Sequence, residues 1–131
     1  MSASAAIGPE RYPPAVWQRF AAPAHAGAPP EAVSACARDA AHQLEIGFHA
    51  GARGVRFSAV GCPTTIAVAD YCAEIWSAAG EPPSTQAIVD ALEIAEDRRH
   101  CVRLCEDAVR ALQARMAESP SREVHRNRQA S

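Results

Sequence analysis

The spacing of apolar residues first predicts strands in the N-terminal half of the chain. Polar and apolar residues alternate over 43–48 and over 54–60, the pattern of half-buried strands, and a shorter, weaker strand is expected over 32–36. The link 49–53 has the length and the glycine of a hairpin turn. Together these segments predict an antiparallel meander with one buried face and one solvent-exposed face.

After Gly61 the apolar spacing changes from two to about 3.6 residues, which indicates helices. One helix is expected from Pro63 to near Gly80, a second after Ser84 as N-cap, and a third over about 100–117.

Near the N-terminus, proline residues delimit the expected elements. Pro13 and Pro14 predict the start of a short helix that ends near Phe20. Three further prolines in residues 21–30 predict a connecting loop, because proline cannot continue a helix or donate to a sheet.

Strands followed by helices in separate blocks predict an α+β fold, with a small antiparallel three-stranded sheet and helices packed on one of its faces. A chain of 131 residues can bury one core but not two. We therefore expect one domain over 10–117, a disordered N-terminus over 1–9 and a disordered polar tail over 118–131.

The charge balance excludes several classes of protein. With 13 basic and 15 acidic residues the net charge is −2, so no nucleic-acid partner is expected. No apolar run has the roughly 20 residues of a membrane span, so no membrane partner is expected either. Residues 1–6 lack the basic and apolar regions of a signal peptide, which predicts a cytoplasmic location.

Five cysteines, an odd number, are better explained in a reducing compartment by metal binding, catalysis or burial than by disulfides. Cys62 falls between a predicted strand and the proline that opens a helix, and Cys101 falls in the first turn of the last helix. Both positions favour a thiolate. Cys36 is expected at the end of the weak strand. Three thiolates at the ends of elements can meet at one point and bind a soft metal or an iron–sulfur cluster.

The other cysteines and the histidines receive separate interpretations. Cys72 lies within a predicted helix and is expected in the core, whereas Cys105, one turn after Cys101, is either core or part of the site. His100, next to Cys101, is the histidine best placed as a further ligand or proton carrier. The remaining four histidines are assigned no role.

Four segments resemble the IscU/NifU-type iron–sulfur scaffold family. The segment "VRFSAVGCPTTIAVADYCAEIW" is similar to the strand and helix around the second cysteine of that family, and "RRHCVRLCEDAVRAL" is similar to the helix that carries the third. The segments "YPPAVWQRFAAPAHAG" and "SACARD" resemble the opening helix and the first-cysteine loop. The resemblance extends over about residues 11–116.

The resemblance implies a non-enzymatic scaffold with an IscU/NifU-like fold. It places Cys36, Cys62 and Cys101 at the three cluster-ligating positions, and Asp39 and His100 at positions that tune or complete the metal site. The implied activity is assembly of a labile [2Fe–2S] cluster from iron and from sulfur delivered by a cysteine desulfurase, followed by transfer to iron–sulfur acceptor proteins.

Two alternatives remain open at this point. One is a zinc-binding (Zn²⁺) sulfur acceptor of the same fold that stimulates a cysteine desulfurase and uses the same ligands. The other is a metal-free, divergent interaction module. Residues 95–99 stand where scaffold members usually carry a proline-containing chaperone motif, so an Hsp70-type chaperone is a doubtful partner.

Overall fold

The computed structural model describes the backbone of residues 11–130 and the side chains of residues 11–118. The elements in chain order are α2 (Pro14–Ala21), β1 (Val33–Asp39), β2 (Leu44–Gly51), β3 (Gly54–Val60), α3 (Pro63–Ala79), α4 (Thr85–Leu92), the 3₁₀ helix η2 (Glu96–Arg98) and α5 (Arg99–Ala130). The disordered N-terminus that the sequence predicts over residues 1–9 lies outside the described residues.

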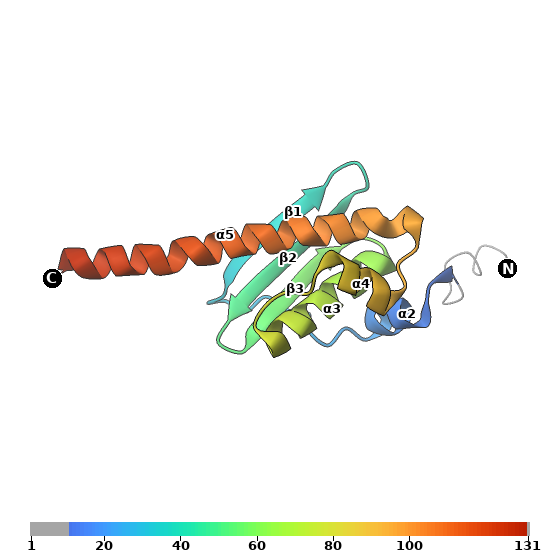
Figure 1. The fold of residues 1–131 in the computed structure, drawn as a ribbon, viewed down its shortest axis with the longest axis horizontal. Helices are drawn as coiled ribbons and strands as arrows, with labels where there is room; N and C mark the ends of the chain where they lie inside the picture. The colour runs from blue at the N-terminus through green and yellow to red at the C-terminus, as the bar shows by residue number, and fades with distance from the viewer. Residues whose placement is uncertain (1–10, 131) are drawn as a thin grey trace.

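The three strands form one antiparallel sheet in the order β1-β2-β3. Helix α3 packs mainly on β3, helix α5 packs on β1 and β2, and the two helices contact each other. They therefore form one layer on one face of the sheet (Figure 1). The predicted α+β fold, with a three-stranded antiparallel sheet and helices on one face, is confirmed.

The core lies between the sheet and the two long helices. The core includes Ile46, Phe48 and Phe57, which come from the expected apolar face of the strands and are buried. Phe48 meets Trp76 of α3 edge-on, with ring centroids 5.7 Å apart. Because residues on a strand alternate between faces, the intervening polar side chains point away from the helices.

Local sequence determines where the helices begin and end. Helix α3 has proline in its first turn and ends at Gly80, whose φ of 83° lies in the left-handed region that favours glycine. Helix α4 begins after Ser84, whose hydroxyl accepts a hydrogen bond from the Ala87 N–H at 3.1 Å. The N-cap predicted at Ser84 is therefore present.

The loop after α2 is tied to the free edge of β3. The Gly27 N–H donates to the Phe57 carbonyl at 2.8 Å, and the Phe57 N–H donates to the His25 carbonyl at 3.0 Å. This single bridge occurs in a segment whose prolines exclude a longer ladder. It pairs the N–H and the carbonyl of Phe57, which would otherwise be unpaired at the outer edge of the sheet.

Helix α5 continues to Ala130. It thus extends into residues 118–131, where the composition predicts a polar tail. The division of the chain into a domain and two disordered ends stays a prediction. Over the part of the chain that the structure describes, no helix has the length and apolarity that a membrane crossing requires.

Candidate functional site

Two of the predicted cysteines lie together where β3 leads into α3 and where α5 begins. The sulfur atoms of Cys62 and Cys101 are 3.9 Å apart. The Thr65 hydroxyl lies 3.4 Å from the Cys62 sulfur and donates to the Cys101 sulfur at 3.3 Å. Cys101 is fully buried and Cys62 is half-buried. The pair therefore presents one sulfur toward solvent and one toward the core.

The chain reaches this geometry through a close turn at Gly61. Its φ of 149° is one that side-chain-bearing residues rarely adopt, and an added Cβ would lie 2.5 Å from Leu44 Cδ2 and 3.2 Å from Thr65 Oγ1. The absence of a side chain at Gly61 lets the end of β3 pass close over these two residues. Cys62 then occupies the N-cap position of α3 in an extended conformation.

The surroundings of the two sulfurs separate their acidities. The hydrogen bond with Cys101 is the largest of the causes that together lower the pKa of Cys62 to about 4. Burial opposes this shift, and the hydroxyl of Thr65 and the backbone amides of Thr65 and Thr64 add to it. The same hydrogen bond, together with burial, raises the pKa of Cys101 above its usual range. At neutral pH the site holds a Cys62 thiolate beside a Cys101 thiol.

A second polar group surrounds His100, directly before Cys101. The His42 ring stacks on the His100 ring with centroids 4.1 Å apart. Asp39 accepts hydrogen bonds from the His42 ring at 2.9 Å and from the His42 backbone N–H at 3.2 Å. The His42 side-chain hydrogen bond is the main cause that lowers the pKa of Asp39. Asp39 and His100, both predicted as site residues, therefore meet through His42.

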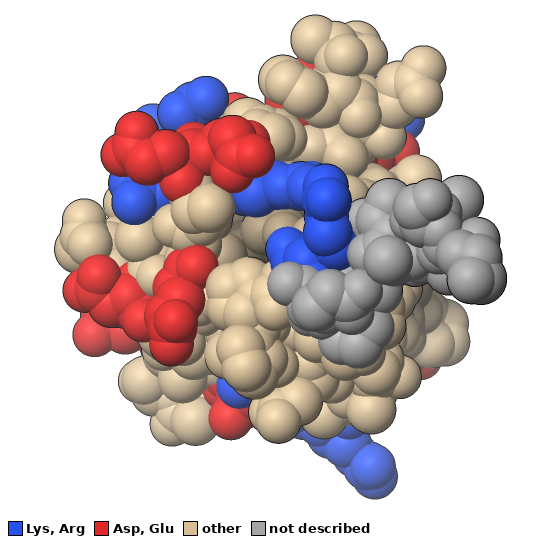
Figure 2. All heavy atoms as spheres, turned by 90° about the vertical axis from the view of Figure 1, so that its right-hand side faces the viewer, with Lys and Arg blue, Asp and Glu red and all other residues tan. Residues whose placement is uncertain are grey.

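A guanidinium group completes the surroundings of Cys62. Arg98 of η2 lies against the Cys62 sulfur and over the Tyr12 ring, with its central carbon 5.4 Å from the ring centroid. Figure 2, which views this end of the molecule, shows basic side chains at the centre of the face with acidic side chains beside them. The positive charge of Arg98 favours the thiolate form of Cys62.

The structure does not bring Cys36 to this site. Strand β1 extends through Asp39, so Cys36 lies in the middle of a strand and not at its end. It pairs with Gly47, which pairs with Ser58, and these residues alternate with the buried apolar ones. Cys36 is exposed on the face of the sheet that the helices leave open. The expectation that all three sulfurs meet is wrong.

The open face of the sheet carries its own polar cluster beside Cys36. The two ring nitrogens of His49 lie 2.8 Å from the Ser34 hydroxyl and 2.9 Å from the Ser58 hydroxyl. Burial lowers the pKa of His49. Both nitrogens are engaged, so these hydrogen bonds satisfy the imidazole in place.

The two remaining cysteines belong to the core. Cys72 and Cys105 are fully buried, and their thiols interact across the contact between α3 and α5. This interaction and burial raise the pKa of Cys105 well above its usual value. The structure thus places Cys72 where the sequence predicts it, and assigns Cys105, left open by the sequence, to the core with Cys72.

Burial predicts different stability costs for two cysteine substitutions. We expect Cys72→Ser to lower the free energy of unfolding by about 1–3 kcal/mol, because it buries a hydroxyl in a site built for a thiol. Cys36→Ser, on the open face, should change it by less than about 0.5 kcal/mol. Urea denaturation followed by circular dichroism measures both values. Equal effects would contradict the positions of these side chains.

One further cluster of ligand-type side chains joins α2, its following loop and α3. His25, Asp70 and Glu74 form a possible metal-binding group, because each has one ligand atom within 4.8 Å of those of the other two. Arg19 already bridges the two carboxylates, at 2.8 Å from Asp70 and 2.7 Å from Glu74. Among the side chains that the structure describes, no other group of three potential ligands is this close. Cys62 and Cys101 are thus a pair without a third nearby ligand of this kind.

Sequence reasoning missed three residues that shape the site. Thr65 could have been noticed because it lies one turn after Cys62, with its hydroxyl on the same side of α3. His42 stands three residues after Asp39, the spacing at which an aspartate side chain receives a backbone hydrogen bond in a turn. The contact between Arg98 and Cys62 depends on the tertiary fold and has no local signal.

No protein-family model matches this chain, and a search of curated protein sequences finds no match to it.

Proposed function

We propose that this chain is a scaffold that assembles a labile [2Fe–2S] cluster from iron and desulfurase-derived sulfur, and that it holds this cargo through Cys62 and Cys101. The observation that supports the proposal is the 3.9 Å separation of the two sulfurs. Two thiolates bound to one tetrahedral iron or zinc, at about 2.3 Å each, lie roughly 3.8 Å apart. Both sulfurs can therefore bind one metal ion with little rearrangement.

Cys62 is the residue that would receive the sulfur. Its pKa of about 4 makes it a thiolate at neutral pH, and it is half-buried, so an incoming donor can reach it. The Cys62 thiolate attacks the terminal sulfur of a desulfurase persulfide and forms a new S–S bond. The S–S bond of the donor breaks, and the desulfurase cysteine leaves as a thiolate.

Cys101 would become a ligand only when it loses its proton. Its buried thiol donates to the Cys62 thiolate in the metal-free protein, and binding of a cation at the pair favours its deprotonation. His100 directly precedes Cys101 in the chain and meets Asp39 through His42, and in this proposal these side chains would take up that proton. In this proposal Cys36 is not a ligand, since its side chain lies on the other face of the sheet.

Anaerobic reconstitution with a cysteine desulfurase, cysteine and ferrous iron tests the proposal. We expect visible absorption bands of a [2Fe–2S] cluster in the wild type and in Cys36→Ala, and loss of more than about tenfold of this absorption in Cys62→Ala and Cys101→Ala. Cys36→Ala is the matched control, because it removes a thiol outside the site. Cluster formation in Cys62→Ala, or its loss in Cys36→Ala, would contradict the proposed ligands.

A zinc-binding sulfur acceptor is the second candidate, and the same sulfur spacing supports it because the spacing suits a single tetrahedral ion equally well. In that case the reconstituted protein would lack cluster absorption, retain one zinc per chain and gain the mass of one sulfur atom on Cys62. Absence of metal and of sulfur transfer would contradict both candidates and leave a metal-free interaction module.

A further inference from the structure

A pocket of about 220 Å³ opens between the start of α2 and the segment that leads from α4 into α5. It is smaller than the roughly 300–1,000 Å³ of pockets that hold drug-sized ligands, so it suits a smaller molecule. Thr64, in the first turn of α3, lines it, two residues after Cys62. Arg98 lines it too and lies against the Cys62 sulfur. The pocket and the thiol site are therefore neighbours.

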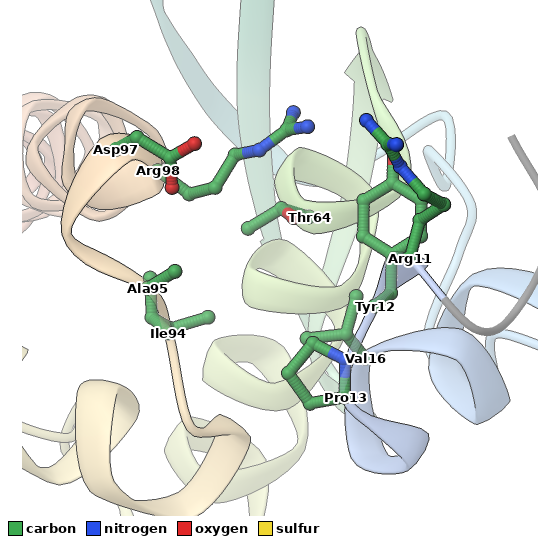
Figure 3. Close-up of a pocket in the computed structure, with 9 residues that line it drawn as sticks. All are labelled: Arg11, Tyr12, Pro13, Val16, Thr64, Ile94, Ala95, Asp97 and Arg98. Carbon is green, nitrogen blue, oxygen red and sulfur yellow. The ribbon is translucent and has the colours of Figure 1, made fainter. Parts of the chain in front are cut away.

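The side chains around the pocket divide into a charged side and an apolar side. Figure 3 shows the guanidinium groups of Arg11 and Arg98 on the same side, while Val16 and Ile94 lie on the opposite side. Asp97 adds a carboxylate beside Arg98. Two guanidinium groups suit a carboxylate, which they bind with charge-assisted hydrogen bonds, and the Asp97 carboxylate suits an ammonium group.

A cluster held at Cys62 and Cys101 would need further ligands, which a molecule bound in the neighbouring pocket could provide. A [2Fe–2S] cluster takes four ligands from outside its own sulfides. Only Cys62 and Cys101 provide sulfur here, because Cys36 lies on the open face of the sheet. A small external thiol held beside Cys62 could supply a further sulfur ligand, and it could leave when the cluster is handed on.

We propose that this pocket binds a small zwitterionic thiol of the cysteine type, with its carboxylate between Arg11 and Arg98, its ammonium group toward Asp97 and its sulfur toward Cys62. The role of this thiol as an external cluster ligand rests on the function proposed above. The binding itself does not, because the pocket and its charges are formed by side chains of this chain alone. In this arrangement the S–H group of the ligand would lie toward the Cys62 sulfur.

Calorimetric titration of the reduced, metal-free full chain under argon tests the binding. The probe is L-cysteine, and three analogues each lack one group: cysteamine lacks the carboxylate, 3-mercaptopropionate the ammonium and L-alanine the thiol. We expect each analogue to bind more weakly than L-cysteine, and cysteamine at least about tenfold more weakly, because it cannot pair with either guanidinium group.

Two variants locate the bound groups. Arg11→Ala should weaken L-cysteine binding about tenfold without affecting folding, because Arg11 is exposed. Asp97→Asn should weaken binding of L-cysteine but not of 3-mercaptopropionate. Arg53→Ala, in the exposed β2–β3 turn and outside this pocket, is the matched control and should leave the affinity unchanged.

The outcomes separate this inference from the proposed function. Equal affinity for L-cysteine and cysteamine, or an unchanged affinity in Arg11→Ala, would overturn the site. Equal affinity for L-alanine would overturn the assignment of the ligand as a thiol. Cluster formation without L-cysteine binding would refute this inference alone, whereas L-cysteine binding without cluster formation would refute only the scaffold.

Discussion

Replacing Asp70 with alanine should lower the free energy of unfolding by about 3–5 kcal/mol, the range found when one partner of a buried ion pair is removed. Asp70 is 1% exposed in the middle of α3. Its carboxylate accepts hydrogen bonds from the Arg19 guanidinium and from the His25 backbone N–H, both at 2.8 Å. One buried side chain thus fastens α2 and the following loop to α3.

A matched acidic residue on the same helix isolates the effect of burial. Glu74 contacts the same arginine at 2.7 Å, but its side chain is 42% exposed. We expect Glu74→Ala to cost less than about 1 kcal/mol, since exposed ion pairs contribute little. Asp70→Asn, which keeps an oxygen for the His25 N–H, should fall between the two alanine variants. Urea denaturation measures all three values, and equal costs for Asp70→Ala and Glu74→Ala would contradict the tethering role.

The elements that the sequence predicts well are those in which one local pattern determines the outcome. Leu44, Ile46 and Phe48 alternate along β2 and are all buried, because a two-residue period leaves only one face that can cover a core. The start of α3 follows equally directly from Pro63, and its end follows from Gly80. Propensity and pattern agree at these positions, so little tertiary information is needed.

Cys36 shows where local reasoning fails. The segment around it has weak strand propensity, which suggests a short strand with Cys36 at its end. Pairing with β2 extends β1 to Asp39, through the register that joins Cys36 to Gly47. That register puts Cys36 on the open face, since neighbours across an antiparallel ladder share a face. The position of this sulfur depends on its partner strand and not on its own segment.

The Cys62–Cys101 pair was predictable in part because the position of each cysteine depends on its own segment of the chain. Each residue stands at the N-terminal end of a helix, and such ends gather at the edge of a sheet when the helices pack on one face. The roles within the pair were not predictable. The hydrogen bond between the two sulfurs, and then burial, which is complete only for Cys101, make Cys62 the thiolate and Cys101 the thiol. Both causes are properties of the assembled core.

Removing the Cys101 thiol should raise the pKa of Cys62 from about 4 by about two pH units. The hydrogen bond with Cys101 is the largest cause that stabilises the Cys62 thiolate, whereas burial of Cys62 opposes it and persists in Cys101→Ala. Alkylation by iodoacetamide follows the thiolate fraction. The wild-type rate should therefore be nearly constant between pH 6 and 8, whereas an ordinary thiol with a pKa near 8.5 gains about tenfold per pH unit below that value.

In Cys101→Ala the alkylation rate of Cys62 should fall as the pH is lowered through about 6, because a raised pKa leaves less thiolate at a given acidic pH. The measurement needs the Cys36→Ala background, since Cys36 is exposed and would also react, while Cys72 and Cys105 are buried. Cys101→Ser keeps a donor to Cys62 and should shift the profile less than Cys101→Ala does. An identical pH midpoint in the wild type and in Cys101→Ala would show that the helix N-terminus and Arg98, and not the paired thiol, keep Cys62 ionised.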